Sequence, residues 1–360
     1  MNKPIARRSV LAGLAVAAGG LAAPAGFVRN AWSEGRSINV GTYLGPQGEF
    51  VRHNVIPKFE KDFGCKINQT QGVTLDQIAI LRAQRANPTY SVMFMDDSGV
   101  PIAKDDGLIV PLPRDKMPNL EKVISGLVVS DGHGAAFAVS ALVPYFNSDV
   151  VQSIDSYSDL WDPKFQGRFM MPTPKQTQSL ALLIATAALV TGKPLKDAQY
   201  DIDSAWKKIA ELKHNILTVY DNNVTAILQV SQGQADVGGP DFTKSIIPYI
   251  RKGATIGISY PKEGIAAGVN CVTVVKGSPE PDLAAAFANR MLDPEVQAGM
   301  ANATFSAPSI SGVTLDPEVA KVAMYPEAKM KEKGLLLIDW SYIYPRRAEI
   351  IQKLNQVLAS

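Results

Sequence analysis

Cysteine is scarce in this 360-residue sequence, which contains only two such residues. Cys65 and Cys271 have no other cysteine or histidine at a metal-ligand spacing, so the sequence predicts neither a disulfide framework nor a zinc site. Each lies in an apolar, strand-like run, which favours two buried free thiols over a single bridge between them, although the bridge stays open as an alternative. No cofactor is expected.

Catalytic signatures are also missing. The three histidines, His53, His133 and His214, are far apart in the sequence, and neither cysteine has an evident activating base. There is no Gly-x-Ser-x-Gly, no phosphate-binding loop and no His-Glu-x-x-His. We therefore expect a protein that is not an enzyme, and keep an exported enzyme as a minor alternative.

Acidic residues are absent from residues 1–31, whose basic residues are Lys3, Arg7, Arg8 and Arg29. The arginine pair precedes an apolar, small-residue run at 12–23, and small residues around Ala25 suit a signal peptidase. This pattern predicts a signal peptide over residues 1–31. It resembles a twin-arginine signal, although Ala6 and Val10 depart from that motif and leave the general secretory route open. A membrane anchor is disfavoured, because a spanning helix needs about 20 strongly apolar residues.

Removal of residues 1–31 leaves 32 basic against 34 acidic residues, a net charge of −2. A nearly neutral chain without a basic cluster argues against nucleic acid as a partner. The sequence thus predicts a periplasmic protein, which we expect to be a monomer.

Strand-like and helix-like periods alternate from Ser37 onward. The expected strands are 38–43, 65–71, 90–95, 168–172, 216–220 and 235–239, and the expected helices include 75–86, 178–191, 224–231, 281–292, 294–302 and 344–358. Such alternation predicts an α/β fold with two mostly parallel sheets flanked by helices.

The chain is expected to cross twice between two lobes, near 137–144 and 260–270. Two short crossings form a hinge. We predict lobe 1 over 36–140 and 263–310, lobe 2 over 141–262, and a C-terminal helical segment over 311–360.

Four segments together resemble the bacterial extracellular solute-binding proteins of ABC transporters, a family that includes the spermidine/putrescine-binding proteins. They are Ser156–Arg168, Gln232–Val237, Tyr260–Gly264 and Asp339-Trp340. The resemblance implies a two-lobed periplasmic binding protein fold, type II-like, whose cleft captures a small solute for an inner-membrane ABC permease. Polyamine-binding members carry Trp-x-Asp after the return crossing, where this chain has Gly268 and Asn270, which argues against a long linear polyamine.

Ligands of open α/β sheets gather at the carboxyl ends of the strands. The polar residues expected there are Thr42, Tyr43, Asp96, Asp97, Ser98, Asp221, Asn222 and Asp241. With Asn270, which lies within an extended apolar run, they are the predicted ligand-binding residues. The acids among them favour a solute with a cationic nitrogen.

Each candidate also has a structural interpretation. The Asp and Asn residues precede expected helices and are typical N-caps, Tyr43 is an ordinary packing residue, and Asn270 needs hydrogen-bond partners if it is buried. A ferric or other metal ion is an alternative ligand, although Tyr220, Tyr249 and Tyr260 are spread along the chain rather than adjacent.

Overall fold

The computed structural model describes residues 35–359, so the predicted signal peptide lies outside the described residues. Within them, no helix is both long enough and apolar enough to cross a membrane. The strands are β1 (Ser37–Tyr43), β2 (Lys66–Gly72), β3 (Tyr90–Asp96), β4 (Ile109–Val110), β5 (Val128–Val129), β6 (Gly134–Phe146), β7 (Phe169–Pro172), β8 (Ile216–Tyr220), β9 (Val237–Phe242), β10 (Gly257–Ile258), β11 (Ile265–Val275) and β12 (Leu335–Leu336).

The α-helices are mostly short. They are α1 (Pro46–Phe50), α2 (Ile56–Phe63), α3 (Thr74–Ala83), α4 (Val100–Asp105), α5 (Thr177–Thr191), α6 (Leu195–Ala198), α7 (Trp206–Glu211), α8 (Asn223–Ser231), α9 (Thr243–Arg251), α10 (Pro281–Arg290), α11 (Pro294–Thr304), α12 (Pro317–Val322), α13 (Glu327–Glu332), α14 (Trp340–Ile343) and α15 (Arg347–Ala359).

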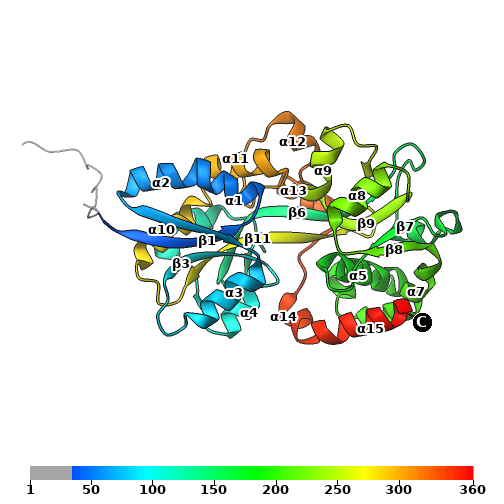
Figure 1. Ribbon diagram of the computed structural model, residues 1–360, viewed down its shortest axis with the longest axis horizontal. Helices are drawn as coiled ribbons and strands as arrows, with labels where there is room; N and C mark the ends of the chain where they lie inside the picture. Colours follow the sequence, from blue (N-terminus) through cyan, green and yellow to red (C-terminus); the bar gives the residue numbers. More distant parts are fainter. Residues whose placement is uncertain (1–34, 360) are drawn as a thin grey trace, which may run out of the picture. The chain divides into compact units, whose positions relative to one another are not determined.

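The first lobe is built on the parallel strands β2, β1 and β3, with β1 in the middle. After β1 the chain forms β2 on one side of it and then β3 on the other side. Because such crossovers are right-handed, α2 and α3 must cover opposite faces of the strands. Figure 1 shows this arrangement, with α2 and α3 on either side of β1 and β3.

The second lobe is built on β9, β7 and β8, where β7 is parallel to both neighbours. Its central helix α5 is apolar all round and buried from Gln178 to Ala188, as expected for a helix inside a core. Trp340, Ile350 and Leu354 belong to the same buried cluster, so the C-terminal segment packs against this lobe.

Two long strands connect the lobes. β6 is antiparallel to β11 over residues 135–142 and then to β9 over residues 142–146. The hydrogen bonding therefore runs without a break from one lobe to the other, where the sequence had predicted two separate sheets, because a 13-residue strand is long enough to serve both. These strands overlap the two predicted crossings, near 137–144 and 260–270, while the predicted domain boundaries stay predictions.

The α/β, two-lobed fold class is confirmed, and so are the free cysteines. Cys65 and Cys271 are both buried and unpaired. Cys271 lies inside β11, and burial raises the pKa of its thiol well above the ordinary value. It is therefore an apolar packing residue.

Candidate functional site

Three of the predicted ligand-binding residues lie together where β1, β3 and β11 run side by side. Tyr43 ends β1 and Asp96 ends β3. Asn270 on the antiparallel strand β11 is directly opposite Asp96 in the ladder. The sheet register thus brings a phenol, a carboxylate and an amide from distant parts of the sequence to one place.

A hydrogen-bonded chain joins these residues to the second lobe. Asn270 Nδ2 donates to Asp96 Oδ1 at 2.8 Å, and Thr74 Oγ1 donates to Asp96 Oδ2 at 2.8 Å. Asn270 Oδ1 accepts from Gln47 Nε2 at 2.8 Å and from Lys244 Nζ at 3.0 Å. Because Lys244 belongs to α9 of the second lobe, the buried amide of Asn270 links a cation on one lobe to an anion on the other.

A cavity of about 390 Å³ opens beside this chain, and we call it the first cavity. Its wall includes Tyr43, Gln47, Thr74, Asp96 and Asn270 from the first lobe and its crossing strand, and Lys244, Ser245 and Pro248 from the second. Its size is that of a small-molecule site. Asp96 and Lys244 are the charged side chains among its described lining residues.

Burial shifts the pKa values of two ionisable side chains at this cavity, Lys244 and Tyr43. It lowers the pKa of Lys244, whereas the nearby carboxylates Asp96, Asp97 and Asp241 act to raise that pKa. Burial, and to a lesser degree the charge of Asp96, raises the pKa of Tyr43 well above its ordinary value. Asn270 and Asp96 lie close to the Tyr43 hydroxyl, but within residues 35–359 it makes no hydrogen bond of normal geometry, so it can still donate to a ligand.

A second cavity of about 340 Å³ adjoins the first, and the two share Val73, Thr74 and Asp96. Its other polar and aromatic lining residues are Ser98, Lys175, Thr177, Trp340, Tyr344 and Arg347. Asp96 therefore borders both cavities.

Comparison with known proteins identifies the family. A family model described as "Bacterial extracellular solute-binding protein" matches residues 54–329 of this chain. The chain belongs to this family. The resemblance found in the sequence is thus confirmed over most of the chain, and the family implies an exported protein.

The relatives of this solute-binding protein are distant and differ in ligand. "Iron uptake protein A1" of Synechocystis is 24% identical over 73% of this chain and 74% of its own length. The "Spermidine/putrescine-binding periplasmic protein" of Escherichia coli K12 is 20% identical over 86% of this chain and 89% of its own length. A crystal structure of an ABC transporter from Clostridium perfringens has a TM-score of 0.77 at 20% identity, covering 89% of this chain and 99% of the other. This likeness shows a shared fold, while the names of the two relatives give different ligands.

The other predicted residues of the first lobe differ in position. Ser98 lines the second cavity. Thr42 is buried and faces β2, where its hydroxyl accepts from Gln69 Nε2 at 2.7 Å and donates to the Thr70 carbonyl at 3.3 Å. It lines neither cavity, because successive side chains of a strand point to opposite faces.

Asp97 is buried outside both cavities. Its Oδ1 accepts the Ser98 N–H at 3.0 Å. The helix that follows, α4, begins at Val100 with Gly99 at the N-cap position and no side-chain cap, so the capping interpretation of Asp96 and Asp97 is wrong. Burial raises the pKa of Asp97 to about 7, partly offset by the Trp340 N–H, which lies nearby but makes no hydrogen bond of normal geometry.

Asp241 in the second lobe is fully buried on β9. Its Oδ1 accepts from Phe242 N at 2.6 Å and from Asn223 Nδ2 at 2.9 Å, while its Oδ2 has no hydrogen-bond partner among the described residues. Burial raises the pKa of Asp241 to about 7. Helix α9 begins after Phe242, so Asp241 is not its cap either.

The remaining predicted residues, Asp221 and Asn222, precede α8. Asn222 accepts the Thr225 N–H at 3.0 Å, which confirms the capping interpretation for this residue. The Asp221 carboxylate is exposed, and neither residue lines the two cavities. A ligand role for Asp221 and Asn222 stays a prediction.

Sequence reasoning missed the residues that come from helices rather than strand ends. Lys244 lies two residues after β9, so a slightly wider search around strand ends would have found it. Gln47 in α1 and Arg347 in α15 carry no such signal, because only the tertiary fold brings these helices to the cavities.

The tyrosines considered for a ferric ion do not converge on the first cavity. Tyr220 is buried near Tyr145 and Asp241, and the Tyr260 hydroxyl donates to the Val322 carbonyl at 3.2 Å. Among residues 35–359, no group of three or more His, Cys, Asp or Glu side chains is placed to hold a metal ion.

Phe242 occupies the space where polyamine binders are expected to carry tryptophan. A Cβ added to Gly268 would lie 2.1 Å from Phe242 Cε1, so even alanine does not fit unless the ring moves. We expect Gly268→Ala to lower the free energy of unfolding by about 1–3 kcal/mol, as overpacking usually does. Urea unfolding of this variant, alone and in a Phe242→Ala background, measures the effect. An equal loss in both backgrounds would mean that the ring is not responsible.

Proposed function

We propose that this ABC-type substrate-binding protein captures a small polar organic solute carrying a protonated amine, and delivers it from the periplasm to an inner-membrane permease. The observation that supports this most directly is Asp96. Its carboxylate borders the first cavity, and Thr74 and Asn270 each donate one hydrogen bond to it. Each oxygen keeps a lone pair, so a charged donor can be added without displacing either bond.

The surroundings of Asp96 suit an amine. Tyr43 lines the cavity, and an aromatic residue there can contact a cation or an alkyl chain. The cavity volume, about 390 Å³, suits a compact molecule. Phe242, against Gly268, leaves no room at that position for an indole to stack on a long alkyl chain.

The experiment is a calorimetric screen of the mature protein against primary amines, diamines, amino acids, sugars and Fe(III). We expect saturable binding of one or more amines at micromolar or lower dissociation constants, without chemical conversion of the ligand. Fe(III) is included because one relative is named an iron uptake protein. Tight binding of Fe(III) alone would replace the amine with a metal ion as the ligand, and conversion of a compound would favour an enzyme.

A further inference from the structure

Arg347 borders the second cavity with part of its guanidinium group unused. This residue begins α15, and its Nη2 donates to the Lys175 carbonyl at 2.8 Å. Its Nη1 is buried and has no hydrogen-bond partner in the part of the chain that the structure describes. The guanidinium carbon lies 5.7 Å from the centre of the Trp340 ring, which also borders the cavity. A buried N–H group without a partner is costly, and a bound acceptor would remove that cost.

The charge of Arg347 is uncompensated as well. Among residues 35–359, no carboxylate forms a salt bridge with Arg347 or with Lys175, the two cations of this wall. Burial lowers the pKa of Arg347 to about 10. The adjacent Arg346 differs, because it donates to Asp203 Oδ2 at 2.8 Å and this bond raises its pKa. A partly buried cation without a counter-ion favours binding of an anion.

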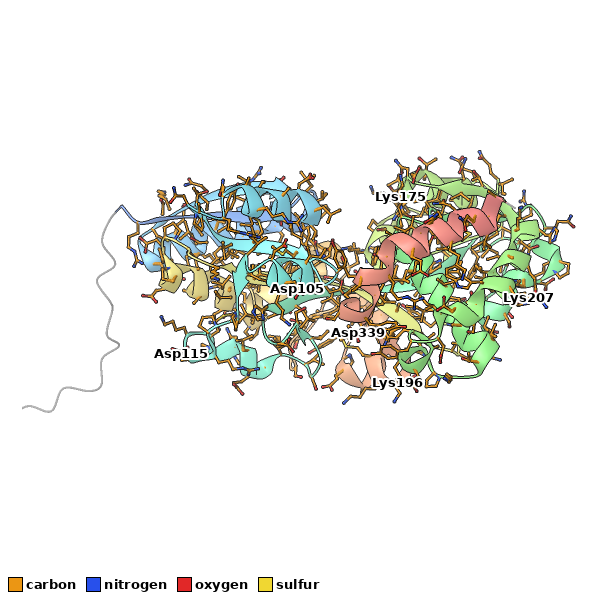
Figure 2. All side chains as sticks on the ribbon, turned by 90° about the horizontal axis from the view of Figure 1, so that it is seen from below. Asp105, Asp115, Lys175, Lys196, Lys207 and Asp339 are labelled. Carbon is orange, nitrogen blue, oxygen red and sulfur yellow. The ribbon has the colours of Figure 1, made fainter. Side chains whose placement is uncertain are left out.

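The second cavity connects this cationic wall to the acid of the first. Arg347 and Lys175 come from the second lobe and Asp96 from the first, and all three border the same cavity. Figure 2 shows Lys175 beside the C-terminal helix that carries Arg347. One small molecule can therefore reach both charges.

We propose that Arg347, supported by Lys175, is an oxyanion subsite, so that the captured solute carries a carboxylate or phosphoryl group in addition to its amine. This inference rests on the proposed function for the amine, but the oxyanion subsite can be tested without it. The guanidinium fork matches the oxygens of either group, and its free Nη1 supplies the donors. A solute held by Asp96 on one lobe and Arg347 on the other is fully bound only when both lobes contact it, which favours the closed form.

The first test measures thermal unfolding of the mature protein in sodium acetate, sodium phosphate and sodium chloride at equal ionic strength. We expect acetate or phosphate to stabilise the wild type more than chloride does, and Arg347→Met to lose this difference. Arg346→Met is the matched control, because it removes a neighbouring arginine paired to Asp203 and should keep the response. A response to acetate indicates a carboxylate subsite, and a response to phosphate indicates a phosphoryl subsite. General salt effects act equally on the wild type, Arg347→Met and Arg346→Met.

The second test measures calorimetric affinities for 3-aminopropanoate, 2-aminoethylphosphonate and propylamine. We expect at least one of the two amino oxyanions to bind the wild type about 10- to 100-fold more tightly than propylamine, a typical gain for a charged hydrogen bond. Arg347→Met should remove this preference, and Arg347→Lys, which keeps the charge, should retain part of it.

An equal response of the wild type and Arg347→Met to oxyanions, or no response in the wild type, would overturn the subsite. Binding of amines that depends on Asp96 would then still support the proposed function. Conversely, an oxyanion response with no amine binding would reject the proposed function alone. Lys175→Met should weaken the oxyanion response more than Lys207→Met does. Lys207 is exposed, so its variant shows the effect of a general loss of positive charge.

Discussion

An Asp96→Asn protein should bind its amine ligand about 10- to 100-fold more weakly than the wild type, because a charge-assisted hydrogen bond becomes a neutral one. The fold should survive the change. An asparagine oxygen can still accept from Asn270, and its amide can donate to the Thr74 hydroxyl, so neither existing partner is left unpaired. Isothermal titration calorimetry measures the loss.

Asp115→Asn is the matched control for this variant. Asp115 lies in the same lobe, is exposed and lines neither cavity, so its loss removes the same charge without touching the site. Figure 2 labels this residue. Equal affinity of Asp96→Asn and the wild type would show that the amine binds elsewhere.

The contribution of Asp97 to the stability of the protein should fall as the pH rises from about 4 to about 7. Burial raises the pKa of this carboxyl from about 3.8 to about 7, so between these values the folded protein holds a proton that the unfolded chain releases. Proton linkage then lowers the free energy of unfolding with increasing pH, by about 4 kcal/mol over the interval, and leaves it constant above pH 7.

Asp97→Asn removes this contribution. From pH 4 to pH 8, the free energy of unfolding of Asp97→Asn should rise by about 4 kcal/mol relative to that of the wild type. Urea titrations of both proteins at pH 4, 6 and 8 measure this difference. Asp241, whose pKa is also about 7, is present in both proteins and cancels in the comparison. Parallel curves for the two proteins would show that Asp97 is ionised in the folded protein throughout this range.

The second-lobe acid illustrates how far the sequence alone could go. Asp241 was expected at a strand end and lies there, but whether its carboxylate faces solvent, a helix terminus or the core depends on how α5 and α8 pack over β9. In the structure Asn223 and Gln178 donate to Oδ1 of Asp241, and Oδ2 has no hydrogen-bond partner within residues 35–359. Strand position is local, whereas burial depends on elements distant in sequence.

By itself, the sequence determined the elements and the family. The apolar runs of β1, β3 and β7, and the apolar helix α5, were predicted closely because their periodicity is a local property of the chain. It also placed Tyr43 and Asp96 at the ends of strands and Asn270 within an extended run. Only the tertiary structure decided that Asn270 lies opposite Asp96 and that Lys244 reaches Asn270 from the other lobe. It also decided that Nη1 of Arg347 is buried without a hydrogen-bond partner among the described residues. The physical reason is that strand register, lobe contact and desolvation arise from interactions between segments far apart in the chain, which no local pattern records.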